Sequence, residues 1–151
     1  MNEIQNIKKI MVPVDFSDNS QKILKSAAML AQKFGAGLNV VFVVQSFEDY
    51  SGFFVPHVPI VQFEEEMAKN AEEKITQFIK EGVPAGVACE SKILRGDVAE
   101  ELVNYAATAG IDLIVMGTHG YKGLEKILFG SVAEKVIKTA PCPVLSINPY
   151  R

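Results

Sequence analysis

The sequence predicts one α/β domain built on a doubly wound parallel sheet, and three observations support this fold class. Short, almost wholly apolar segments, typical of strands buried on both faces, alternate with longer segments whose apolar residues recur every three or four positions. Such alternation favours right-handed βαβ crossovers with helices on both faces of the sheet. The chain has 151 residues, 48% hydrophobic and 22% charged, so residues 1–151 fit a single globular domain.

Five segments have the character of strands. Residues 8–14 and 38–44 read KKIMVPV and LNVVFVV, which are nearly continuous apolar runs. Residues 87–94 alternate between apolar and polar side chains well enough for a third strand. The remaining strands are expected at residues 111–116 and 143–147. In such sheets ligands bind beyond the carboxyl ends of the strands, where the strand order reverses.

The segments between the first three strands contain two helices. The first helix begins at Ser17 or Asp18 and ends at Gly35, because serine and aspartate are good caps and glycine commonly ends a helix. A loop with aromatic residues and prolines follows the second strand, over residues 45–60. The second helix spans residues 61–81 and is closed by a glycine.

Two further helices are expected in the second half of the chain. The third begins after Asp97, which has a glutamate three residues later, and ends before Gly110. The last is expected at residues 131–140, where Ser131 and Glu134 form a capping box. The capping box by itself explains the serine, whether or not a ligand binds.

A glycine pattern follows the fourth strand and precedes the last helix. Its members are Gly117, Gly120, Gly130 and Ser131, in the order Gly, two residues, Gly, nine residues, Gly-Ser. Glycines let the backbone approach a ligand closely, and the free N–H groups of a helix start, here expected from Gly130 to Val132, attract anions. A polyphosphate could therefore lie between the first turn and the helix start. The glycines could also be simple turn residues.

The chain resembles the universal stress protein family along nearly its whole length. The resemblance rests on IMVPVDFS at residues 10–17, on the glycine pattern at residues 117–131 and on PCPVL at residues 141–145. It implies a Rossmann-like, five-stranded parallel sheet of order 3-2-1-4-5. It also implies that the chain binds ATP, with Mg²⁺ accompanying the phosphates.

The family pattern further implies which residues form the nucleotide site. Asp15 would lie near the ribose or the metal ion, Val43 against adenine, and the glycine segments along the sugar and phosphates. Asp15 could instead cap the first helix, and His119 could either meet the γ-phosphate or be exposed to solvent. The complete set is Pro13, Val14, Asp15, Val43, Met116, Gly117, His119, Gly120, Gly130, Ser131 and Val132.

The sequence favours a binding module over an efficient enzyme. It contains no GxxxxGK[ST] and no GxGxxG, and only Asp15 is a candidate for the metal ions and base that rapid phosphoryl transfer needs. We therefore expect an ATP-dependent sensor or switch of the stress response, in which nucleotide orders residues 117–130 and residues 45–62 report the state. The alternatives are an ATP-independent interaction protein of the same fold and a slow ATPase.

Composition limits the partners and the location. The net charge of −3 and the pI near 5.4 argue against nucleic acid as a principal partner. No apolar run approaches the roughly 20 residues of a membrane span, and the first residues have no signal core, so we expect a cytoplasmic protein. Cys89 and Cys142 lack metal-site spacing and are expected to be buried thiols. The last strand, 143–148, is expected at a sheet edge, and the resemblance implies a homodimer through it.

Overall fold

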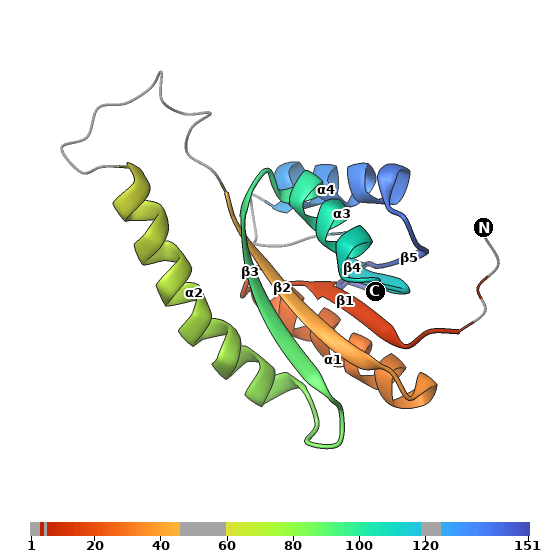
Figure 1. Ribbon diagram of the computed structural model, residues 1–151. Helices are drawn as coiled ribbons and strands as arrows, with labels where there is room; N and C mark the ends of the chain where they lie inside the picture. Colours follow the sequence, from red (N-terminus) through yellow and green to blue (C-terminus); the bar gives the residue numbers. More distant parts are fainter. Residues whose placement is uncertain (1–3, 5, 46–59, 119–124) are drawn as a thin grey trace.

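The computed structural model describes residue 4 and residues 6–45, 60–118 and 125–151, and within them five strands alternate with four helices (Figure 1). The strands are β1 (Lys9–Pro13), β2 (Gly37–Gln45), β3 (Cys89–Gly96), β4 (Leu113–Gly117) and β5 (Val144–Ile147). The helices are α1 (Asp18–Phe34), α2 (Ile60–Gly82), α3 (Val98–Thr108) and α4 (Glu125–Thr139). The predicted α/β alternation is confirmed.

All strand pairs are parallel and the strand order is β3-β2-β1-β4-β5, as the resemblance implied. The chain runs outward from β1 through β2 to β3, and then returns to the other side of β1 to form β4 and β5. The switch point therefore lies between β1 and β4. The carboxyl ends of these two strands open onto it, which is where doubly wound sheets bind their ligands.

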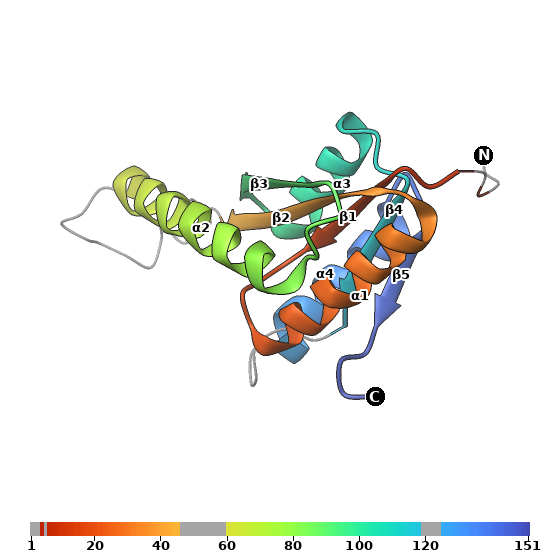
Figure 2. The ribbon, with the colours of Figure 1, turned by 90° about the horizontal axis from the view of Figure 1, so that it is seen from below.

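The sheet separates two hydrophobic cores. Helices α1 and α2 cover one face, and α3 and α4 cover the other (Figures 1 and 2). Because successive strand residues point to opposite faces, Val12 and Val40 belong to the first core while Met11 and Val41 belong to the second. All four side chains are fully buried, which explains the continuous apolar runs in β1 and β2.

The predicted ends of the first and third helices are confirmed. Ser17 is the N-cap of α1 and accepts a hydrogen bond from the backbone N–H of Ser20, while Gly35 ends the helix with φ +65°. Asp97 caps α3 in the same way. Among the described residues, no helix is both long enough and apolar enough to cross a membrane.

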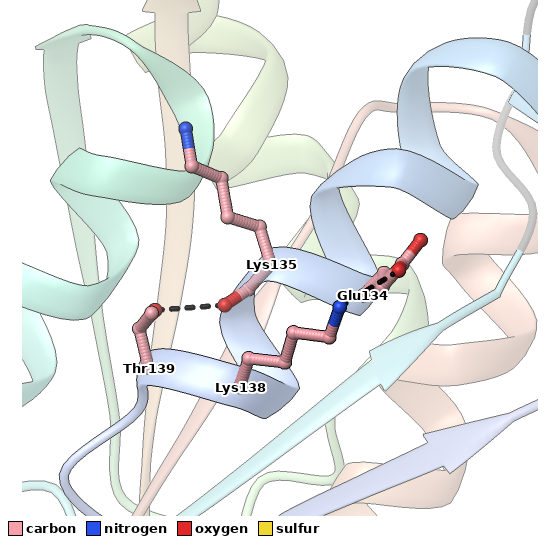
Figure 3. A network of polar contacts seen from close by, with 4 residues as sticks. All are labelled: Glu134, Lys135, Lys138 and Thr139. Atoms are coloured by element: carbon pink, nitrogen blue, oxygen red, sulfur yellow. Dashed lines mark hydrogen bonds and ion pairs between the residues drawn. The ribbon is translucent and has the colours of Figure 1, made fainter.

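The predicted start of the last helix is wrong. Helix α4 begins at Glu125, so Gly130 and Ser131 lie inside it and Ser131 is not its N-cap. Glycine weakens a helix interior by about 1 kcal/mol relative to alanine but does not forbid it, and the three- and four-residue apolar spacing continues upstream of Gly130. Glu134 pairs with Lys138 at 3.1 Å (Figure 3), so it does not close a capping box.

The two cysteines are only partly as expected. Neither forms a disulfide, and each is partly rather than fully buried. Burial, with a smaller contribution from the Glu90 carboxylate, raises the pKa of Cys89 to about 11. Burial and the charge of Asp112 also raise the pKa of Cys142. Both thiols therefore stay protonated near neutral pH and pack as small, weakly polar groups.

Candidate functional site

The carboxylate of Asp15 lies directly after β1, at the switch point, and is held there by hydrogen bonds. Asp15 Oδ1 accepts hydrogen bonds from the backbone N–H of Ser17 at 3.0 Å and from its hydroxyl at 2.5 Å. The backbone N–H of Asp15 donates to Ser20 Oγ at 2.8 Å. No described residue donates to Oδ2. One oxygen of the carboxylate is therefore held by the turn, and the other can accept a hydrogen bond or bind a cation.

The residue that caps α1 is Ser17, so the alternative role of Asp15 as the helix cap is wrong. Asp15 instead binds the capping residue itself, through its N–H and hydroxyl. A side-chain oxygen that accepts from the N–H two residues later defines an Asx turn. The carboxylate therefore organises the turn that leads into α1 without belonging to the helix.

Phe16 gives this turn an uncommon backbone. Its φ is +65°, and among the described residues it is the one non-glycine with a positive φ. The left-handed conformation costs an L-residue about 1–2 kcal/mol. The Phe16 ring packs against Phe42 of β2 at 4.7 Å between centroids and edge-on against Phe78 of α2 at 5.5 Å. These contacts offset the cost, because aromatic pairs contribute about 0.5–1.5 kcal/mol beyond their buried area.

An apolar cluster lies toward the end of β2, on the face covered by α3 and α4. In the β1–β2 register Pro13, the last residue of β1, is opposite Val41, and the Val14 N–H donates to Val41 O, so Asp15 follows β1 at the edge of the sheet toward which Val43 lies in β2. Val43 belongs to the same packed cluster as Met116 of β4 and, at its margin, Val132 of α4. Three of the residues predicted from the resemblance therefore lie together.

Three of the predicted residues, Val14, Met116 and Gly117, are buried. The Val14 side chain is 4% exposed and lies in the core on the opposite face, under α1 and α2, and its backbone N–H donates to Val41 O of β2. Met116 is completely buried, and Gly117 next to it is also buried. Any contact of these residues with a ligand would be made by backbone atoms.

A hollow of about 280 Å³ opens where β2 and β3 end and α3 begins. This volume is just below the roughly 300–1,000 Å³ usual for small-molecule sites, so it suits one part of a nucleotide rather than the whole. Two of its lining residues were predicted from the sequence, Ser131 and Val132. The lining comprises Gln45, Asp97, Val98, Ala99, Ser131, Val132 and Lys135.

Lys135 adds a positive charge to this hollow. Figure 3 shows its side chain extending away from the ion pair between Glu134 and Lys138, one turn after Ser131. Among the described residues Lys135 forms no ion pair, whereas Glu134 pairs with Lys138, four residues along the helix. The sequence reasoning missed Lys135, although its four-residue spacing from Ser131 places both on one face of a helix.

The predicted phosphate cradle is only partly described. Gly130, Ser131 and Val132 lie in the interior of α4, so their N–H groups belong to the helix ladder and are not the free groups of a helix start, which corrects that expectation. His119 and Gly120 lie outside the described residues. Thr118, which follows Gly117, donates its N–H to Ile147 O of β5 at 3.0 Å. No group of three or more His, Cys, Asp or Glu side chains within the described ranges could hold a metal ion.

A larger hollow, about 430 Å³, lies elsewhere, between α1 and the end of α2. Its walls include Met29 and Gln32 from the second half of α1, which lies toward the amino ends of the strands. Because ligands of doubly wound sheets bind at the carboxyl ends, we place the candidate site at Asp15 and the smaller hollow.

Comparison with known proteins shows the family and the fold. A sequence profile described as the universal stress protein family matches residues 6–148. The universal stress protein MJ0531 of Methanocaldococcus jannaschii is 40% identical over 143 residues, covering 93% of this chain and 82% of that protein. The solved structure of MJ0577, from the same organism, has a TM-score of 0.78 at 29% identity and covers 95% of this chain and 97% of its own. A universal stress protein from Archaeoglobus fulgidus, solved in complex with dAMP, has a TM-score of 0.59 at 25% identity, covering 95% and 100%.

Proposed function

Because this chain belongs to the universal stress protein family, we propose that it binds an adenine nucleotide, ATP above all, at the carboxyl ends of β1, β2 and β4. The observation that carries the proposal is the Asp15 carboxylate at the switch point of the sheet, whose Oδ1 is held by Ser17 and whose Oδ2 accepts no hydrogen bond from a described residue. The dAMP complex of the Archaeoglobus relative supports the same ligand class.

The residues suggest how the nucleotide divides among them. A ribose hydroxyl donates to Asp15 Oδ2, since an ionised carboxylate accepts hydrogen bonds strongly. The base lies against Val43, which is in β2 two residues beyond the partner of Pro13, toward the same edge of the sheet as Asp15. Ser131 and Lys135 line the adjoining hollow and offer a hydroxyl and a cation to phosphate oxygens. Apolar walls with a few placed polar groups are typical of such sites.

The residues also fit Mg²⁺ carried by the phosphates. Mg²⁺ prefers oxygen ligands and usually binds through one or two carboxylates together with substrate phosphates and water. Asp15 Oδ2 could supply one such oxygen. The ion would neutralise phosphate charge, and the phosphates and water would complete its ligand set.

We infer that the occupied site acts as a signal read by other proteins in the stress response, rather than as a catalyst. Rapid phosphoryl transfer needs a positioned base and charge stabilisation on the leaving group, and Asp15 is held by Ser17 in the turn. A slow ATPase is the competing possibility. Phosphate release over hours from the Mg-ATP complex distinguishes the two.

Nucleotide binding is tested by thermal shift and calorimetry with Mg-ATP, on the wild type and on Asp15→Asn. Ligand at a hundredfold excess over Kd stabilises a protein by about 2.7 kcal/mol. Loss of a hydrogen bond to a charged group costs about 1.5–3 kcal/mol, so Asp15→Asn should bind about 10- to 150-fold more weakly. Asp18→Asn is the matched control, because it removes the same charge three residues away in the first turn of α1. If the wild type shows no binding at millimolar Mg-ATP, the ATP-independent alternative replaces this proposal.

We also propose a homodimer through the β5 edge. In the sheet β5 pairs with β4 only, Leu145 on it is 41% exposed, and Ile137 of the adjacent α4 is 51% exposed. An unpaired edge with exposed apolar side chains favours association. Sedimentation at micromolar concentration should give a dimer that Leu145→Asp converts to monomer. Met29→Asp, an exposed position on α1, should leave the dimer intact, and a wild-type monomer would refute the proposal.

A further inference from the structure

The strained residue of the described chain stands next to the carboxylate of the candidate site. Phe16 has a φ of +65°, a conformation that side-chain-bearing residues rarely adopt. Backbone strain of this kind persists only where the surroundings impose it, and it occurs frequently at binding sites. Because Phe16 lies between Asp15 and the N-cap Ser17, its left-handed conformation affects how these two residues meet.

The side chains that hold Phe16 in the left-handed conformation lie on the face of the sheet opposite the candidate site. Phe16 packs with Phe42 and Phe78 in the core under α1 and α2, whereas Val43 and the hollow lie on the face covered by α3 and α4. The ring therefore anchors the turn from the face opposite the candidate nucleotide. A ring at this position can hold the backbone without occupying the ligand's space.

The left-handed residue sets the direction of the Asp15 carboxylate oxygen that Ser17 does not bind. At Phe16 the chain turns so that both the N–H and the hydroxyl of Ser17 donate hydrogen bonds to Asp15 Oδ1. Ser17 Oγ also accepts from the N–H of Ser20, so its own hydrogen points to Asp15. With Oδ1 held in this way, Oδ2, which accepts from no described residue, has one fixed orientation.

We propose that Phe16 is a positioning residue for ribose selectivity: its clamped ring holds the Asp15 turn so that Oδ2 meets the ribose hydroxyls. The inference rests on the proposed nucleotide site. It goes further by assigning discrimination between sugars to a side chain that does not itself touch the ligand.

The test compares the affinities for Mg-ATP and Mg-2′,3′-dideoxy-ATP, measured by calorimetry. The dideoxy analogue lacks both hydroxyls, and it is needed because a relative binds dAMP, which lacks only one. The wild type should prefer ATP by at least about tenfold, the value of a hydrogen bond to a charged group. In Phe16→Ala this ratio should fall to within about twofold of unity, chiefly through weaker ATP binding. A merely structural loss would weaken both ligands equally and leave the ratio unchanged.

Two further variants and one ligand-free measurement complete the experiment. Phe34→Ala, which removes an exposed ring at the far end of α1, should keep the wild-type ratio. Phe78→Ala removes the edge-on partner of Phe16 from α2 and should lower the ratio of the two affinities to a value between those of the wild type and Phe16→Ala. This variant tests the inference even if Phe16→Ala folds poorly. In the absence of nucleotide, amide hydrogen exchange at the Ser17 N–H should be about tenfold faster in Phe16→Ala.

The outcomes separate this inference from the proposed function. A wild type that binds ATP and the dideoxy analogue equally would refute the ribose contact of Asp15 and the role of Phe16 together. A wild type that discriminates, with Phe16→Ala discriminating equally well, would overturn the role of Phe16 alone. Unchanged exchange at the Ser17 amide in Phe16→Ala would overturn it without any nucleotide.

Discussion

Replacing Tyr105 with phenylalanine should destabilise the protein by leaving a buried amide without its partner. Asn39, in the middle of β2, is 8% exposed and donates from Nδ2 to the Tyr105 hydroxyl of α3 at 3.0 Å. Removing one partner of a buried hydrogen bond costs about 1–3 kcal/mol, because the other group cannot return to water. For a chain of this length each kcal/mol lowers the melting temperature by about 2–4 °C.

The chain contains a matched control for this substitution. Asn19 is 9% exposed, close to Asn39, and donates to the Tyr150 hydroxyl at 2.9 Å; because Tyr150 is 54% exposed, water can take the place of the lost hydroxyl in Tyr150→Phe, so the two variants differ in the exposure of the tyrosine. We expect that variant to lose less than about 0.5 kcal/mol, as surface substitutions usually do. Replacing both members of the buried pair, as Asn39→Val with Tyr105→Phe, should restore most of the stability. Urea titrations measure the wild type and these variants, and equal losses in Tyr105→Phe and Tyr150→Phe would refute the reasoning from burial.

Three more substitutions test the local interactions. Ser17→Ala should lower the free energy of unfolding by about 1 kcal/mol in urea, because α1 loses its N-cap; an unchanged midpoint would contradict the cap. Asp112→Ala should cost about 1–2 kcal/mol, since Oδ2 accepts the backbone N–H groups that open β1 at 2.9 and 3.0 Å, and Asp112→Asn, which keeps an acceptor, should cost less. In a Cys142→Ser background, Cys89 should be alkylated by iodoacetamide more slowly than in the unfolded chain. Between pH 9 and 11 the unfolded thiol loses its proton while the folded one keeps it, so stability attributable to Cys89 should fall as pH rises. Equal alkylation rates at pH 9.5 would argue against the raised pKa.

The fold could be predicted from the sequence because its strands are buried on both faces. Continuous apolar runs of strand length, as in β1 and β2, are typical of a parallel sheet covered by helices, and the caps Ser17 and Asp97 mark helix starts by local hydrogen bonds alone. The start of α4 could not be placed, because a glycine at position 130 is compatible with either a helix end or a weakened interior.

The candidate site could be predicted only in part, for a different reason. The sequence predicts Asp15, Val43 and Val132 from their positions relative to the strand ends and from the family pattern. In the structure Val43 and Val132 belong to one packed cluster, and Asp15 follows β1, the strand that pairs with the strand of Val43. Lys135 could not be singled out, because the sequence does not show which of Lys135 and Lys138 lines the hollow, and the two side chains have the same chemistry. The left-handed Phe16 has no local signal either, because phenylalanine ordinarily avoids that conformation.

The central position of β1 has a consequence for the kinetics of the molecule. One neighbour of β1 is β2, the next strand along the chain, but the other is β4, and the contact that aligns it joins Lys9 to Asp112, 103 residues away in the sequence. Closing so long a loop is slow, and parallel sheets built on such contacts fold more slowly than local structures. We expect the candidate site, which lies at this junction, to be among the last parts of the molecule to form. A bound nucleotide should accordingly slow global unfolding.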